Sequence, residues 1–364
     1  MVPSSDRGPV AARIAHAPSR AREAATLAPM DDLLPGLRGQ ERARRRLAAA
    51  LDRGRLPHAL AFVGPSGVGR ALAARALARA LHCAEAPRRG CGTCPACRRI
   101  DAGHHAGLEW LRPADGARTI SVEAARDVRN RAMRAPLEGP AHVIVVDPAE
   151  ALTVQAANAL LKVLEEPPEG VYFMLLCAGL GGLLPTIASR CVPIRFGTLP
   201  AAEVESIMDE HLPELDGKTR RAALDLAAGR PGEALRLARD PSVPALLDLL
   251  AAARAAVAEG PSAVFAGDGG AFWTALAAAA KATGIKGTAG ERAAALALID
   301  LWALEARRDL LRAAGSGRGG AARAARLLER LANARAALER NASVRLCLED
   351  LVLTLADDAP CDAA

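Results

Sequence analysis

The chain has 364 residues, of which 51% are hydrophobic but only 2% aromatic, and its formal net charge is +6. Its length suffices for two or three domains of about 100–200 residues each, and an apolar content dominated by alanine and leucine favours helices. The charge and a pI near 9.1 are compatible with a nucleic-acid partner. Without a long uncharged apolar run or a secretory signal, we expect a cytoplasmic protein that does not cross a membrane.

The N-terminal half begins with a segment that lacks apolar periodicity. Residues 1–32 are rich in Arg, Ala and Pro, so a disordered tail is expected there, and Met30 is a second candidate for the first residue of the native chain. Apolar runs and amphipathic stretches then alternate. Strands are predicted at 59–63, 109–111, 142–146, 171–177 and 192–196, and helices at 38–54, 71–81, 122–133 and 153–166. This alternation predicts a parallel sheet with flanking helices over 33–197.

The second half contains no further strand-like run. Short helices are predicted at 201–212, 219–228 and 232–239, and longer ones at 245–259, 271–283, 290–314, 321–341 and 344–355. We therefore expect a small helical domain over 198–243 and an all-α domain over 244–364.

A glycine-rich segment, Gly64–Arg70, follows the first strand and begins a helix, which is the context of a phosphate-binding P-loop. Gly64, Gly67 and Gly69 supply its glycines. Arg70 replaces the lysine that would reach the phosphates, and Ala71 replaces the hydroxyl residue that would bind Mg²⁺. We interpret the segment as a degenerate P-loop; whether it still binds a nucleotide stays open, because backbone amides alone can hold phosphate.

Two carboxylates follow the strand at 142–146, where the Walker B motif of an ATPase would lie. An active site needs an Asp for Mg²⁺ and a second carboxylate close by. Here Pro148 follows Asp147, and Glu150 comes three residues after it. Asp147 is therefore a degenerate Walker B residue, with a solvated carboxylate at a strand end as the alternative.

Four cysteines follow the P-loop helix with the spacing C-x₇-C-x₂-C-x₂-C: Cys83, Cys91, Cys94 and Cys97. Four thiolates suit a structural Zn²⁺ and leave no position open for catalysis. An iron–sulfur cluster is one alternative, and disulfides, which are rare in the cytosol, are another. The neighbouring histidines are expected to face solvent: His82, His104 and His105.

Ser189 and Arg190 precede the last strand, at an edge of the expected sheet. An arginine in such a place can act in trans on a phosphoryl group bound to a neighbouring subunit. A surface ion pair is the alternative interpretation of Arg190.

Longer motifs in this chain resemble the AAA+ subunits of the bacterial DNA polymerase III clamp loader. The resemblance rests on the glycine loop with its preceding His58-Ala59-Leu60, on the four-cysteine insertion, on Asn158–Pro168 and on Leu184–Cys191. It covers residues 33–240 strongly and the C-terminal third by pattern only. It implies an AAA+ α/β domain, a helical lid, a C-terminal collar, structural Zn²⁺ on the four cysteines, and Arg190, with Ser189, as an arginine finger.

The resemblance also favours one branch of that family. Its ATP-hydrolysing γ/τ members carry a P-loop Lys and Thr, an Asp-Glu pair, a sensor-1 Thr and a sensor-2 Arg. The matching positions here are Arg70, Ala71, Asp147-Pro148, Cys177 or Ala178, and Gly232. These differences favour the δ′ branch, a stator without ATPase activity of its own. The implied partners are the γ/τ and δ subunits and, through the complex, the sliding clamp and primer–template DNA.

Two other functions stay open. One is a γ/τ-like subunit that still binds or hydrolyses ATP with Arg70 in place of lysine. The other is a free-standing zinc-knuckle DNA-binding protein. The second is disfavoured because the chain has only one Tyr, three Trp and five Phe with which to stack bases.

Overall fold

The computed structural model describes residues 37–134, 136, 138–260, 270–316 and 320–357, so the predicted tail at 1–32 lies outside the described residues. The chain forms two compact units. Of the described residues, the first unit holds 37–65 together with Gly69–Gly197, and the second holds those from Thr198 onward together with the loop tip Ser66–Val68. Each unit is described separately below.

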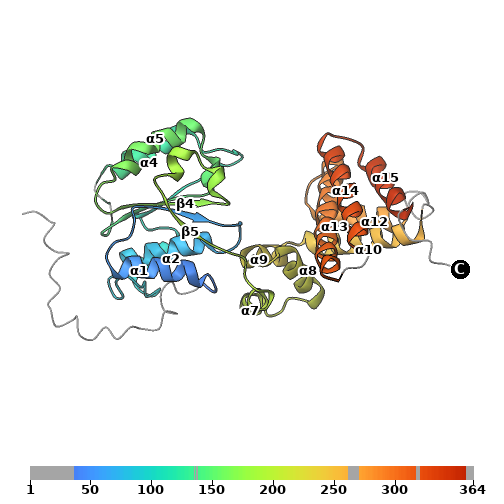
Figure 1. Cartoon of the computed structure of the whole chain (residues 1–364), viewed down its shortest axis with the longest axis horizontal. Helices are drawn as coiled ribbons and strands as arrows, with labels where there is room; N and C mark the ends of the chain where they lie inside the picture. Colours follow the sequence, from blue (N-terminus) through green and yellow to red (C-terminus); the bar gives the residue numbers. More distant parts are fainter. Residues whose placement is uncertain (1–36, 135, 137, 261–269, 317–319, 358–364) are drawn as a thin grey trace, which may run out of the picture. The chain divides into compact units, whose positions relative to one another are not determined.

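A five-stranded parallel sheet forms the first unit, as the alternating pattern predicted (Figure 1). Its strand order is β2-β3-β4-β1-β5. The central strands β1, β3 and β4 are almost completely buried, which explains why they occur as unbroken apolar runs in the sequence. The strands are β1 (Ala59–Val63), β2 (Leu108–Leu111), β3 (His142–Val146), β4 (Val171–Cys177) and β5 (Val192–Arg195).

Helices cover both faces of this sheet. In Figure 1, α1 and α2 (blue) lie against one face, and α4 and α5 (green) lie against the other. Short 3₁₀ turns, η4 (Ala149–Ala151) and η5 (Leu180–Gly182), follow β3 and β4. The helices are α1 (Glu41–Asp52), α2 (Arg70–His82), α3 (Pro95–Ala102), α4 (Val122–Ala132), α5 (Val154–Glu165) and α6 (Pro185–Ala188).

Local sequence explains where α4 and α5 begin. The Ser121 hydroxyl accepts a hydrogen bond from the backbone N–H of Ala124 at 3.2 Å, and Thr153 does the same for Ala156 at 3.1 Å. The buried face of α5 contains Leu160 and Leu164, as its apolar spacing predicted. The same spacing placed Leu161 on that face, but Leu161 is only half-buried and Val163 is buried in its place.

The second unit is helical, and no strand follows Arg195 in the part of the chain that the structure describes. One buried cluster joins α7, α8 and α9 around Met208, Ala223 and Ala234. Another joins α10 to α15 around Leu249, Leu298 and Leu348. The helices are α7 (Ala201–His211), α8 (Gly217–Ala227), α9 (Pro231–Arg239), α10 (Ser242–Glu259), α12 (Ala271–Ala282), α13 (Thr288–Ser316), α14 (Gly320–Glu339) and α15 (Val344–Asp357).

No single helix among the described residues is long and apolar enough to cross a membrane. Within the described ranges, α9 and α10 taken together reach the required length and composition, but the pair is bent by 88°.

Candidate functional site

The glycine loop begins at the carboxyl end of β1, where neighbouring strands crowd its backbone. Gly64 donates its N–H to the carbonyl of Cys177 at 3.0 Å, and a Cβ on Gly64 would lie 2.3 Å from the carbonyl oxygen of Phe196. Gly69 has a φ of +100° and forms the N-cap of α2. The backbone conformation therefore requires glycine at both positions. The 13-residue helix α2 begins directly after the loop, so its N-terminus lies at this edge of the sheet.

The tip of the loop groups with the second unit. The Gly67 carbonyl accepts a hydrogen bond from the N–H of Gly232 at 2.8 Å, and a Cβ on Gly67 would lie 2.9 Å from the backbone nitrogen of Glu233. Gly67, with a φ of +83°, therefore has a packing role in addition to any role toward a ligand.

Arg70 is the first residue of α2, and only 9% of it is exposed. Its Nη1 is buried and has no hydrogen-bond partner among the described residues. Burial raises the pKa of the Cys177 thiol to about 11, with Glu150 adding to the rise and the charge of Arg70 opposing it. The guanidinium therefore lies near the end of β4, where Cys177 also receives the N–H of Gly64. Ala71, the next residue, offers a methyl group where a P-loop would offer a hydroxyl.

Both carboxylates that follow β3 have partners inside the chain. Asp147 Oδ2 lies 3.2 Å from Nη2 of Arg112, the residue that follows β2. The Glu150 carboxylate accepts a hydrogen bond from the backbone N–H of Ala178, which follows β4. Asp147 was expected either as a Walker B residue or as a solvated carboxylate; the structure gives it an arginine partner that the sequence did not indicate.

Arg112 is held by an aromatic ring as well as by Asp147. Its guanidinium carbon lies 4.2 Å from the ring centroid of Trp110 in β2, and that of Arg75 in α2 lies 5.6 Å from the same centroid. Arginine commonly stacks on indole faces in this way. The Trp110 ring of β2 thus contacts two arginines, one that follows β2 and one in α2.

Arg190 lies two residues after the last residue of α6, Ala188, and contacts the last residue of α5. Its Nη2 forms an ion pair with the Glu165 carboxylate, and its Nη1 donates to the carbonyl of Thr186 at 2.8 Å. Ser189 also donates its hydroxyl to the carbonyl of Thr186, at 3.3 Å, and it lies 3.4 Å from Nη1 of Arg190. The Arg190 side chain remains 34% exposed. Arg190 therefore forms the ion pair that was given as its alternative interpretation, while its side chain keeps access to solvent.

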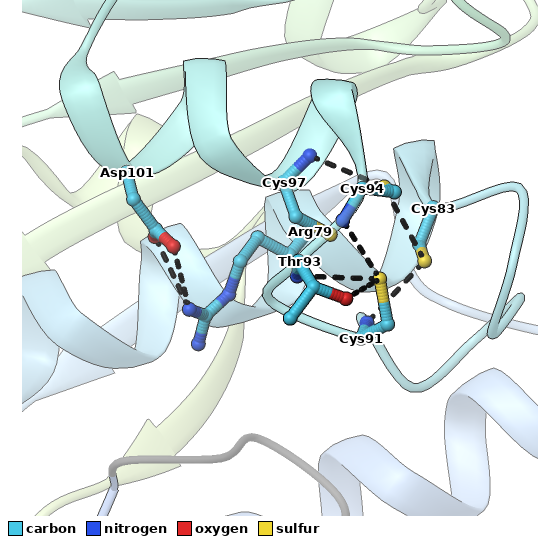
Figure 2. A network of polar contacts seen from close by, with 7 residues as sticks. All are labelled: Arg79, Cys83, Cys91, Thr93, Cys94, Cys97 and Asp101. Atoms are coloured by element: carbon cyan, nitrogen blue, oxygen red, sulfur yellow. Dashed lines mark hydrogen bonds and ion pairs between the residues drawn. The ribbon is translucent and has the colours of Figure 1, made fainter.

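The four cysteines come together at the end of α2 and the start of α3 (Figure 2). Their sulfur atoms all lie within 4.8 Å of one another, and the Sγ atoms of Cys83 and Cys94 are 3.9 Å apart. Tetrahedral zinc with bonds of about 2.3 Å requires sulfur atoms about 3.8 Å apart, so the four thiols fit such an ion. Backbone N–H groups of Cys94 and Cys97 point at sulfur atoms of the group, as in Figure 2.

The local environment shifts the pKa values of two of these thiols in opposite directions. A hydrogen bond from the Thr93 hydroxyl, helped by backbone N–H groups, lowers the pKa of Cys91 to about 6. Burial raises the pKa of Cys97 to about 12. A bound dication would counter this rise, since coordination deprotonates a thiol. The cluster can therefore hold a metal ion of +2 charge.

Two of the three flanking histidines do not face solvent, and this part of the prediction was wrong. His82 and His105 are only 6% and 4% exposed, and their rings stack at 4.4 Å, whereas His104 is exposed as expected. The His105 Nδ1 accepts the N–H of Gly107 at 3.0 Å. A Cβ on Gly107 or on Gly139 would lie 2.5 Å or less from the His82 ring, and His105 Nε2 lies 3.6 Å from the Glu138 carboxylate, so these segments cover the two histidines. Helix α3, which the sequence analysis missed, packs against α2.

Comparisons with known proteins match the first unit. A family model described as "DNA polymerase III, delta subunit" covers residues 39–200. The chain is 37% identical to DNA polymerase III subunit gamma/tau of Mycobacterium tuberculosis over 171 residues. The aligned segment covers 47% of this chain and 29% of that protein. The chain is 36% identical over 187 residues to subunit delta' of Pseudomonas aeruginosa, covering 50% and 57%, and 35% identical over 193 residues to that of Escherichia coli, covering 53% and 58%.

Solved structures give weaker similarities. A DNA polymerase III gamma subunit-related protein of Thermotoga maritima aligns with a TM-score of 0.46 and 16% identity, over 86% of this chain and 98% of that one. A RuvB variant of the same organism aligns with a TM-score of 0.39 over 61% and 66%.

A glycine loop after an inner strand of a five-stranded parallel sheet, followed in the sequence by a helical region, is the organisation of an AAA+ type of P-loop protein. Residues 39–200 thus match a DNA polymerase III family model, and the chain is similar to both the gamma/tau and the delta' subunits of that polymerase. It spans between 29% and 58% of the length of these relatives, and both branches match it at similar identity.

Proposed function

We propose that this chain is a δ′-type stator of the clamp loader, an AAA+ module that does not hydrolyse ATP itself. One observation carries this proposal: the groups that would hold Mg²⁺ in an ATPase are replaced or already engaged. Ala71 has no hydroxyl, Asp147 is paired with Arg112, and Glu150 accepts the N–H of Ala178. Without Mg²⁺ ligands, the charge that develops on a transferred phosphoryl group would not be stabilised.

In this proposal Arg190 acts on ATP bound by a neighbouring γ/τ subunit. Its ion pair with Glu165 and its bond to the Thr186 carbonyl support the role because they orient the guanidinium before a partner arrives. Ser189 is a positioning residue in the same turn. An arginine supplied in trans can contribute roughly 10³–10⁵ in rate.

The four cysteines would hold a structural Zn²⁺. The spacing of their sulfur atoms and the backbone N–H groups directed at them support this assignment. A closed set of four ligands leaves no position for substrate, so the ion would join the end of α2 to α3 without taking part in chemistry.

The helices of the second unit supply the remaining parts of the proposal. Helices α7–α9 (198–243) would be the lid and α10–α15 (244–364) the collar that joins this chain to the γ/τ and δ subunits. The sliding clamp and primer–template DNA would be reached through that complex, in the cytoplasm at the replisome. Phosphate contacts would make DNA binding salt-dependent, in keeping with the net charge of +6.

The test is an ATPase assay of the chain alone and of a loader reconstituted with γ/τ and δ subunits. We expect no turnover by the chain alone. Arg190→Ala should depress hydrolysis by the reconstituted loader without changing its assembly, and Arg126→Ala, an exposed arginine of α4, should leave both unchanged. Loader hydrolysis that is unaffected by Arg190→Ala would refute the role of Arg190.

A γ/τ-like subunit is the second candidate function. It is favoured by the 37% identity to a gamma/tau subunit and by the buried Arg70 guanidinium at the P-loop helix. Mg²⁺-dependent turnover by the purified chain would establish it in place of the stator.

A further inference from the structure

A pocket of about 330 Å³ lies between α1 and the edge strand β5. It is at the amino ends of β1 and β5, where Leu60 pairs with Val192, whereas the glycine loop follows the carboxyl end of β1. Pockets that hold small ligands have volumes of about 300–1,000 Å³, so this pocket is large enough for one large side chain and its backbone. The pocket therefore lies at the opposite edge of the sheet from the glycine loop.

The inner surface of this α1–β5 pocket is aliphatic, and its rim is cationic. Leu47 and Leu60 are each 1% exposed and lie at its base. Three exposed arginines line its outer part: Arg46, Arg53 and Arg55. No acidic and no aromatic side chain belongs to the described residues that line it. The pocket therefore combines an apolar interior with a single sign of charge around it.

Turn geometry fixes the position of two of these arginines. Arg53 is the C-cap of α1, and Gly54 follows with a φ of +62°. The Gly54 N–H donates to the Leu51 carbonyl at 3.0 Å. The Arg55 N–H donates to the Ala50 carbonyl, also at 3.0 Å. This is the hydrogen-bond pattern of a Schellman motif, which ends a helix and pairs its last carbonyls, so the backbone of both arginines is held at the rim of the pocket.

The positive charge of the rim is not neutralised within the described part of the chain. The side chains of Arg53 and Arg55 form no hydrogen bond or ion pair there, and Arg46 donates to a backbone carbonyl of β5 at 2.9 Å. Asp52, at the end of α1, instead forms an ion pair with Arg89 at 3.0 Å. The C-terminal end of a helix contributes only about half a negative charge. Three guanidinium groups outweigh it, so the rim attracts anions.

We propose that the α1–β5 pocket binds a segment of a partner protein in which one large apolar side chain is flanked by carboxylates. The aliphatic interior takes the apolar side chain, and the three arginines face the carboxylates, since opposite charges across an interface set specificity. Nucleic acid fits less well, because single strands bind through bases stacked on aromatic side chains, which the lining lacks. The interaction adds a docking surface to the stator role and does not depend on it.

The test is fluorescence anisotropy of the full chain with labelled, end-capped peptides. The probe is EELEE, which has one leucine between two pairs of glutamates; EEAEE lacks the large side chain, and KKLKK has the opposite charge. We expect EELEE to bind at least tenfold more tightly than EEAEE, no binding of KKLKK, and weaker binding of EELEE as salt screens the charges. Equal affinity for EELEE and EEAEE, or binding of KKLKK, would overturn the proposal.

Variants locate the peptide. Arg53→Gln combined with Arg55→Gln removes two exposed charges, so it should weaken binding of EELEE at least tenfold and leave the melting temperature unchanged. Ala50→Leu fills the pocket from the half-buried Ala50 position and should abolish the preference for EELEE over EEAEE. Arg126→Gln, which changes an exposed arginine of α4, is the control and should bind as the parent does. Unchanged EELEE affinity in the arginine variant would overturn the proposal, whether or not Ala50→Leu folds.

Two further measurements test other occupants of the pocket. A single-stranded oligonucleotide that binds the parent more tightly than it binds Ala50→Leu would assign the pocket to nucleic acid instead. Sedimentation that shows a dimer for the parent and a monomer for Ala50→Leu would assign it to a second copy of the chain. We expect the same oligonucleotide affinity and the same sedimentation for both proteins.

Discussion

Glu165, the last residue of α5, forms an ion pair with the guanidinium of Arg190 at the end of α6. The two residues belong to the two longest motifs by which the chain resembles clamp-loader subunits, the segment Asn158–Pro168 and the segment Leu184–Cys191. The ion pair connects the two motifs physically. Glu165 restricts the orientation of the partly exposed Arg190 side chain, which would otherwise sample many rotamers.

Glu165→Gln should therefore reduce the effect of Arg190 without removing it. The amide keeps an acceptor but loses the charge, so we expect hydrolysis by the reconstituted loader to fall by at most about 10²-fold, less than for Arg190→Ala. Steady-state ATPase kinetics of the loader measure this. Glu166→Gln, the exposed neighbour, is the matched control, and equal kinetics for the two variants would show that the ion pair has no functional role.

Cys94→Ser should abolish stoichiometric metal binding and lower the melting temperature. Cys94 lies at the centre of the group and caps α3 through its sulfur, so both the ion and the helix start are affected. A loss of even about 1 kcal/mol corresponds to a decrease of roughly 2–4 °C in a unit of this size. Metal analysis of purified protein and a thermal melt provide the readouts. Cys347→Ser, outside the group, should keep the metal; iron, or no metal, in the parent protein would contradict the zinc assignment.

The stability of the first unit should decrease as the pH falls below 6.5. Burial lowers the pKa of His105 below its ordinary value of 6.5, with Arg99 acting in the same direction and Glu138 opposing it. Just below pH 6.5 the histidine is protonated in the unfolded chain but still neutral in the folded chain. The free energy of unfolding is therefore highest above pH 6.5 and decreases as the pH falls below it. Protonation would also break the hydrogen bond that Nδ1 accepts from Gly107.

Urea unfolding at a series of pH values measures this effect. His105→Leu should show a shallower decrease below pH 6.5 than the parent, and the exposed His104→Leu should show the parent's decrease. Metal content is measured at each pH so that a loss of stability caused by metal release is not attributed to protonation of the histidine. Identical pH profiles for His105→Leu and the parent would contradict the assignment.

Gly64→Ala should destabilise the first unit. The new Cβ would lie 2.3 Å from the carbonyl oxygen of Phe196, which follows β5. Because this oxygen belongs to the backbone, the clash is relieved only if β5 moves away from β1. Overpacking of this kind costs about 1–3 kcal/mol. Gly179→Ala is the control, because nothing lies within 4 Å of its Cβ. Equal unfolding free energies for the two variants would show that the loop start is not crowded.

The regular elements of the first unit could be predicted because each strand is an apolar run that the sheet buries. Strands β3 and β4 have the predicted bounds, and Ser121 caps α4 as expected. Helix α3 was missed because it begins within the segment Cys83–Cys97, which was interpreted by its cysteine spacing alone. The burial of His82 and His105 was missed as well, because Gly107 and the distant segment Glu138–Gly139 lie against them.

The pairs at the sheet edge could not be predicted from local sequence. Arg112 and Asp147 are separated by 35 residues, and they meet only because β2 and β3 are neighbours in the strand order. Glu165 and Arg190 likewise meet through the packing of α5 against α6. The signal that could have indicated the first pair is a charged residue directly after each of two strands of a parallel sheet.

The most direct test of the central claim is ATP hydrolysis by a loader reconstituted with the parent chain or with Arg190→Ala, measured beside the chain alone. We predict no turnover by the isolated chain and a large fall, of roughly 10³-fold or more at the adjoining site, when Arg190 is replaced. Turnover by the isolated chain, or full activity of the loader that contains Arg190→Ala, would contradict it.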